Sequence, residues 1–234
     1  MLERLKIKYR IIDLYPNYNV RELNVGFARS VKQNEVEKVL EFLENCFDLL
    51  KAYFPQKYNH MTRDVKKIYI TEKLKVIDAT NATAAFVSEI KSIDLPIYLF
   101  ISKIKYKYRI EFIASLILHE AQHARLHRLG FNGNRDMLGR EERICYTLQR
   151  RFGCKLKNGF EIVEFCDYAL SVDLEKYYST ETFLIRQITA LESKDVPNWF
   201  KKFGIRLFIK KYKKLNNIKK DGVIHPDLEK WNHY

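Results

Sequence analysis

The residues with the clearest chemical potential lie in one short segment, His119-Glu120-Ala121-Gln122-His123. An α-helix turns once every 3.6 residues, so two histidines four positions apart project from the same face. Two imidazoles in that arrangement can bind one zinc ion at about 2.0–2.1 Å. Glu120 is rotated by about 100° from His119, so its carboxylate can take a proton from a metal-activated water as that water attacks a carbonyl. The pattern predicts a zinc hydrolase that cleaves an amide bond, with Glu120 as the general base.

Tetrahedral catalytic zinc needs a third protein ligand and keeps its fourth position for water. Leu129 stands six residues after His123, which excludes the arrangement in which that position is a ligand histidine. Glu141 and Glu142 follow on the next predicted helix, and either could supply a carboxylate; Asp136 is a weaker candidate. Helical periodicity alone does not separate the two glutamates, and flanking arginines would also suit a solvent-exposed acidic pair.

Hydrophobic spacing predicts the elements that must position these residues. Apolar residues recur at helical spacing from Gln33 to Phe54, and the stretch from Tyr108 to Leu129 is apolar almost all round, as in a buried helix. Gly130 suits a left-handed end to that helix. We expect further helices at Met137–Phe152, Ser179–Ser193 and Pro197–Leu215, and strands at Ile7–Leu14, Lys67–Ile70, Ala84–Val87 and Pro96–Ile101.

The motif and the later Glu142 resemble the gluzincin branch of zinc metallopeptidases, which includes thermolysin and the zinc aminopeptidases. A closer resemblance is to small bacterial metallopeptidase-like proteins with a His-Glu-Ala-x-His-Ala-Arg helix and a later Glu-x-x-Cys helix, here His119–Arg125 and Glu142–Cys145. The resemblance covers about residues 67–152. It implies that His119, His123 and Glu142 bind zinc and that Glu120 is the catalytic base.

The same resemblance implies an α+β fold with a zincin-like core, in which a small twisted sheet lies over the active-site helix and a second ligand helix. We expect residues 1–178 to form this domain, with its core at about 67–153, and residues 179–234 to form a helical extension packed on it. The chain has no Gly-Ala-Met-Glu-Asn motif, and Arg140-Glu141 stands where an Asn-Glu pair would begin the ligand helix. Assignment to the aminopeptidases is therefore unsupported.

Other polar residues near the motif could assist it. Tyr146 lies one turn from Glu142 and is a candidate donor to the oxyanion, although a tyrosine there also suits core packing. Ser115, Gln122 and Gln149 could orient the histidine rings through their free nitrogens. His127 continues the row of histidines but lies about 6 Å further along the helix, too far to share the ion.

The composition is that of a globular protein with a formal charge of +13 over 234 residues. The cations are interleaved with acids, and no helix-turn-helix, RNA-recognition or zinc-finger pattern is present, so a nucleic-acid partner is not expected. The basic amphipathic stretch 199–214 could make weak contact with an anionic surface, or its apolar face could pack on the body. No apolar run is long enough to span a bilayer, and the N-terminus does not have the pattern of a secretory signal.

We therefore expect a cytoplasmic protein with reduced cysteines and a peptide or protein substrate. The alternatives are a non-catalytic binding protein that keeps the zincin framework, and a basic nucleic-acid-associated protein.

Overall fold

The computed structural model describes residues 17–28, 31–72, 84–101, 109–131, 135–192 and 197–215. The chain divides into two compact units, one of residues 1–132 and 141–171 and the other of residues 133–140 and 172–234. The strand predicted at Ile7–Leu14 lies outside the described residues. The predicted packing of 179–234 on the preceding domain stays a prediction.

The first unit contains a mixed five-stranded sheet in the order β1-β2-β3-β5-β4. The two central pairings are parallel, whereas each edge strand runs antiparallel to its neighbour. Its strands are β1 (Tyr18–Val20), β2 (Leu23–Phe27), β3 (Lys67–Thr71), β4 (Ala85–Val87) and β5 (Ser92–Pro96). The sheet and the helices around it confirm the predicted α+β class.

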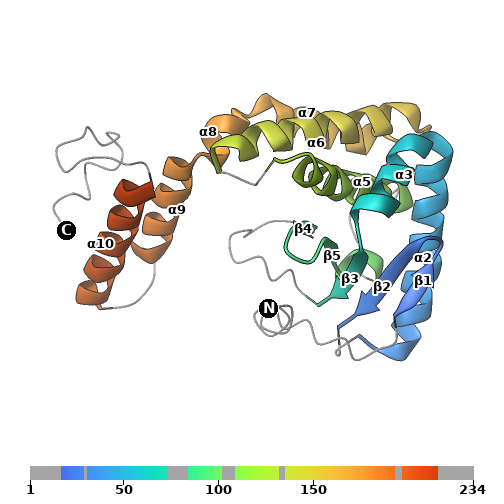
Figure 1. The fold of residues 1–234 in the computed structure, drawn as a ribbon, viewed down its shortest axis with the longest axis horizontal. Helices are drawn as coiled ribbons and strands as arrows, with labels where there is room; N and C mark the ends of the chain where they lie inside the picture. Colours follow the sequence, from blue (N-terminus) through green and yellow to red (C-terminus); the bar gives the residue numbers. More distant parts are fainter. Residues whose placement is uncertain are drawn as a thin grey trace. The chain divides into compact units, whose positions relative to one another are not determined.

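Helices cover this sheet and share one apolar core with it (Figure 1). The longest are α2 (Gln33–Tyr53), α5 (Arg109–Arg128) and α6 (Arg135–Lys155), and the others are α3 (Pro55–Asp64), α4 (Tyr98–Ile101) and α7 (Phe160–Ser171). The predicted stripe of α2 is buried, because Val36, Leu43 and Phe47 have no exposed surface. Pro55 ends the predicted helix by starting α3, where its missing N–H costs nothing.

Helix α5 carries the motif and is buried along most of its length, as its apolar character predicts. It ends at Arg128; Gly130, two residues later, adopts φ +94°, and the Phe131 N–H donates to the Leu126 carbonyl at 3.1 Å. This is the Schellman pattern that glycine favours. Helix α3 is tied to α5 through the buried carboxylate of Asp64, which accepts from Arg128 at 2.8 Å.

Two predicted boundaries are wrong. The strand predicted at Pro96–Ile101 lies earlier, at Ser92–Pro96, and the following apolar residues form α4. Helix α6 does not stop at Gly153 but continues to Lys155, because this glycine serves close packing: a Cβ there would lie 3.0 Å from the Ile162 side chain of α7.

The second unit contains α8 (Leu174–Tyr178), α9 (Thr180–Glu192) and α10 (Asn198–Leu215), and the first residues of α6 also belong to it. The two predicted C-terminal helices are thus confirmed as α9 and α10. They pack through a small apolar cluster of their own, with Leu184, Ile188 and Ile205 buried at its centre. None of the helices in the described residues is long and apolar enough to cross a membrane.

Candidate metal centre

Three side chains from α5 and α6 bring their ligand atoms together. The Nε2 atoms of His119 and His123 lie 3.3 Å apart. Glu142 places Oε2 3.3 Å from His119 Nε2 and Oε1 3.5 Å from His123 Nε2. Neighbouring ligand atoms of a tetrahedral zinc ion with bonds of about 2.0–2.1 Å are about 3.3–3.4 Å apart. The structure thus brings the three residues predicted as ligands together, with the two short Glu142 distances made by different oxygens of its carboxylate.

A buried hydrogen-bond chain sets the orientation of His119. The Ser115 hydroxyl donates to the Phe112 carbonyl at 2.6 Å, and the Gln149 amide nitrogen donates to Ser115 Oγ at 3.0 Å. The amide oxygen of Gln149 therefore faces His119 Nδ1, 3.1 Å away. Since that oxygen can only accept, Nδ1 carries the proton and Nε2 is left with its lone pair directed at the other ligand atoms. Ser115 and Gln149 are both fully buried.

Glu142 carries an unmet polar atom at this point. Its Oε2 is buried and has no hydrogen-bond partner among the described residues, although it lies 3.3 Å from His119 Nε2. A carboxylate oxygen and an imidazole lone pair repel each other unless a cation, either a proton or a metal ion, lies between them. An orphaned oxygen on a three-ligand cluster is what a metal ion would satisfy, so the residues present fit a zinc ion.

Glu141, the alternative third ligand, lies on the other side of the His123 ring. Its Oε2 is 3.9 Å from His123 Nδ1, and the side chain is almost fully buried. This is the position of a carboxylate that orients a metal-binding histidine through its free nitrogen. Geometry therefore favours Glu142 over Glu141 as the ligand, while the Asp136 side chain lies outside the described residues.

Cys145 adds a fourth donor that the motif analysis assigned no role. It lies one turn after Glu142 on α6 and is fully buried. Its Sγ and one ring nitrogen of each histidine all lie within 4.8 Å of one another. A helical residue three positions from a ligand shares its face, which is the signal that could have identified it.

The Glu120 side chain of α5 reaches strand β4. Its carboxylate is buried and accepts a hydrogen bond from the Phe86 backbone N–H. Burial raises the pKa of Glu120, and the charge of Glu142 adds to this, although both histidines oppose it. A carboxyl group with a raised pKa suits proton transfer near neutral pH. The sequence predicts strand β4, whereas its contact with Glu120 depends on how the sheet packs against α5.

The charges at the site raise the pKa of His123 and lower that of Glu142. Burial lowers the pKa of His123, but Cys145, Glu141 and Glu142 raise it well above its ordinary value. Burial opposes ionisation of Glu142, yet both histidines hold its pKa well below the usual range. Burial raises the pKa of Cys145 to about 11 despite the opposing effect of His123. The shifts of His123 and Glu142 thus favour the charged form of each group.

The remaining candidates have other contacts. The Tyr146 ring meets the His119 ring edge-on at 4.6 Å between centroids, so it helps to hold the first histidine; its role as an oxyanion donor stays a prediction. Gln122 Oε1 accepts from Lys57 Nζ at 3.4 Å, and its role in orienting a histidine stays a prediction. His127 packs against Phe86, with ring centroids 6.1 Å apart, and does not join the ligand cluster.

No protein-family model, curated protein or solved structure gives a significant match to this chain. Membership of the gluzincins stays a prediction that rests on the motif, and function is argued below from the geometry of the site.

Proposed function

We propose that this chain is a zinc-dependent metallohydrolase, most directly a peptidase of the gluzincin type with a zincin-like core. The observation that carries the proposal is the convergence of His119, His123 and Glu142: the two Nε2 atoms lie 3.3 Å apart, and each lies 3.3–3.5 Å from one oxygen of the Glu142 carboxylate. A zinc ion held there would supply Lewis acidity to a water molecule and to the substrate carbonyl.

The surrounding residues have separate tasks in this proposal. Glu120, whose carboxylate is bonded to the Phe86 N–H of β4, takes the proton of the attacking water. Because its pKa is raised, it can hold that proton and pass it to the leaving amine. Gln149 keeps His119 in the tautomer that leaves Nε2 free, and Glu141 plays the corresponding part for His123.

The test begins with the metal content of full-length protein purified without a histidine tag. We expect about one zinc per chain, and a large loss of it in His123→Ala. Cleavage of a broad peptide library should be abolished by Glu120→Gln with zinc retained, because this residue acts on the proton and not on the ion. Glu111→Gln, on the same helix but far from the cluster in sequence, is the matched control and should stay active. Full activity in Glu120→Gln would contradict the proposal.

A second candidate is a non-catalytic protein with a closed metal centre. The observation that favours it is the proximity of the Cys145 thiol to both histidines. If this sulfur bound the ion in addition to the two histidines and Glu142, all four positions would be filled and none would be left for water, as in structural zinc sites.

Cobalt substitution separates these two candidates. An open centre gives only the visible bands of tetrahedral or five-coordinate cobalt, whereas a closed one adds an intense near-ultraviolet band from the thiolate. We expect no such band in the wild-type protein and unchanged spectra in Cys145→Ser. Cys154→Ser, which alters the exposed cysteine later on the same helix, is the control. A thiolate band lost only in Cys145→Ser would favour the closed centre.

A further inference from the structure

Helix α10 has two apolar faces, and one of them packs against α9. Ile205 is 1% exposed and packs against Leu184 and Ile188 of α9. Gly204 lets the two helices approach closely, since a Cβ there would lie 2.5 Å from the Leu191 side chain of α9. The apolar face of α10 that carries Ile205 is therefore covered by α9.

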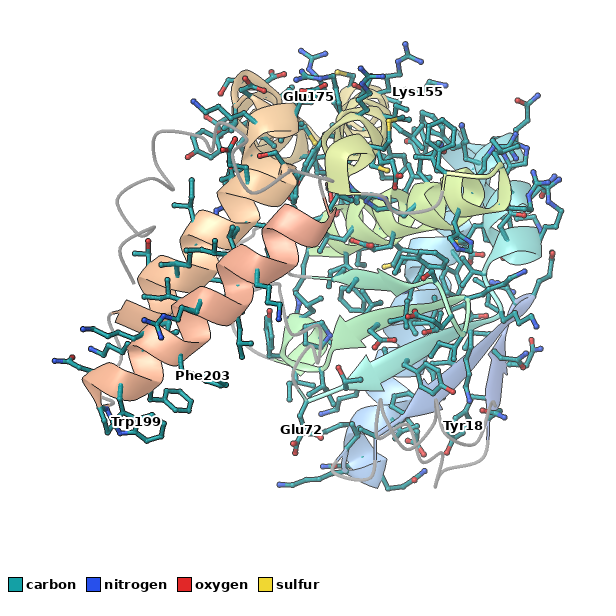
Figure 2. The ribbon with its side chains drawn as sticks, turned by 60° about the vertical axis from the view of Figure 1, so that its left-hand side comes forward. Tyr18, Glu72, Lys155, Glu175, Trp199 and Phe203 are labelled. Atoms are coloured by element: carbon teal, nitrogen blue, oxygen red, sulfur yellow. The ribbon has the colours of Figure 1, made fainter. Side chains whose placement is uncertain are left out.

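The other apolar face is exposed within the described residues. Trp199, Phe203 and Leu207 follow one another at four-residue spacing and are 70%, 57% and 50% exposed, with Phe200 beside them. Residues at this spacing form one stripe along a helix. Figure 2 shows Trp199 and Phe203 projecting from the first part of α10. A stripe of large side chains in this position marks an interaction surface.

Cations accompany this stripe. Lys202, Arg206 and Lys210 are exposed and repeat at the same four-residue spacing alongside it. The whole helix, Asn198–Leu215, contains seven lysines and arginines and no aspartate or glutamate. Large apolar side chains dominate the beginning of the stripe, whereas cations dominate its end.

We propose that this stripe docks α10 on the surface of an anionic lipid bilayer, with the helix lying in the plane of the interface. Aromatic rings, tryptophan above all, are favoured at the boundary between headgroups and acyl chains, and flanking lysines and arginines pair with anionic headgroups. Nucleic-acid grooves also combine cations with aromatic rings, but Leu207 offers nothing to a base stack and completes an apolar stripe. The inference does not rest on the proposed hydrolase activity.

The test uses the full chain with Trp231→Phe, which leaves Trp199 as its sole tryptophan. With vesicles that contain phosphatidylglycerol, we expect a blue shift of Trp199 emission and loss of quenching by acrylamide. Pure phosphatidylcholine vesicles should bind much more weakly. Phe203→Ser with Leu207→Ser should weaken partitioning on the order of tenfold. Phe160→Ser, which alters an equally exposed ring on α7, should leave it unchanged.

Charge requires its own control, because a chain of +13 is attracted to any anionic surface. The triple variant Lys202→Gln, Arg206→Gln, Lys210→Gln should weaken binding far more than neutralising three exposed lysines elsewhere, Lys38, Lys91 and Lys157. Equal losses in the two triple variants, together with no effect of Phe203→Ser and Leu207→Ser, would overturn the proposal. So would a Trp199 already shielded from acrylamide without vesicles, or RNA binding that needs Phe203 while vesicles do not bind.

Discussion

The buried contact between Gln149 and His119 gives the sharpest prediction for the metal centre. In Gln149→Leu the His119 Nδ1–H loses its acceptor, which now lies at 3.1 Å, and Ser115 Oγ loses a donor. Loss of such a partner to a metal-binding histidine typically weakens metal affinity about 10- to 100-fold. That corresponds to about 1.4–2.8 kcal/mol, since each factor of ten is about 1.4 kcal/mol.

Gln149→Glu separates orientation of the ring from simple packing. A carboxylate still accepts from His119 Nδ1–H, so we expect zinc affinity equal to or tighter than that of the wild type. The same variant cannot donate to Ser115 and buries a charge, so its free energy of unfolding should fall by about 1–3 kcal/mol. Affinity and stability should therefore change independently in this variant, whereas both should fall in Gln149→Leu.

The assay is competition for zinc against a chromophoric chelator, with tag-free protein shown to be folded by circular dichroism. Ser115→Ala, which removes the support of Gln149 but not the acceptor itself, should fall between wild type and Gln149→Leu. Unchanged zinc affinity in Gln149→Leu, with stability alone reduced, would show that this residue only packs and would refute the tautomer argument.

Other substitutions test the ligand assignment and the framework. Glu142→Gln should lose far more zinc affinity than Glu141→Gln in the same titration, and the reverse order would make Glu141 the ligand. Burial favours the neutral form of Asp64, but hydrogen bonds from Arg63 and Arg128 hold its pKa below the usual value. The ionised carboxylate therefore contributes fully to the stability of the fold above about pH 4. This contribution is lost as the pH falls through the folded-state pKa. In urea titrations Asp64→Asn should cost about 1–3 kcal/mol at pH 7 and much less at pH 3. Gly159→Ala would place a Cβ in the backbone of α6 and should lower the melting temperature more than Gly130→Ala, whose Cβ meets no atom within 4 Å; equal shifts would contradict the packing argument.

The parts of the fold predicted from sequence are those governed by local periodicity. The spacing of apolar residues places α2, α5, α6, α9 and α10 within a few residues of their observed bounds. Helix α7 was not predicted, nor were strands β1 and β2, which at three and five residues are too short to show a clear alternation. The helix predicted at Met137–Phe152 stops before Gly153 because glycine usually ends helices, whereas in the structure Gly153 admits the neighbouring helix α7.

In the candidate site, too, the features set by local helix geometry could be predicted and those set by packing could not. His119, Glu120 and His123 belong to one helical turn, so their relative directions follow from helix geometry alone. The choice between Glu141 and Glu142 could not be made from sequence, because both face inward once α6 packs on α5. The Gln149 contact with His119 and the Phe86 hydrogen bond to Glu120 join residues thirty or more positions apart, and they depend on how helices and sheet are packed.

Charge balance explains why these residues favour a cation. Glu120, Glu141 and Glu142 are all largely buried around two imidazoles, in the middle of an otherwise apolar core. Buried carboxylates are costly unless they are paired, protonated or bound to a metal. The raised pKa of His123 favours its charged form beside these carboxylates, and the raised pKa of Glu120 lowers the cost of burying that carboxyl group. Binding of a divalent cation to Nε2 of both histidines and to Glu142 would expel the His123 proton and place two positive charges among the same carboxylates, so zinc affinity should rise with pH as that proton is lost.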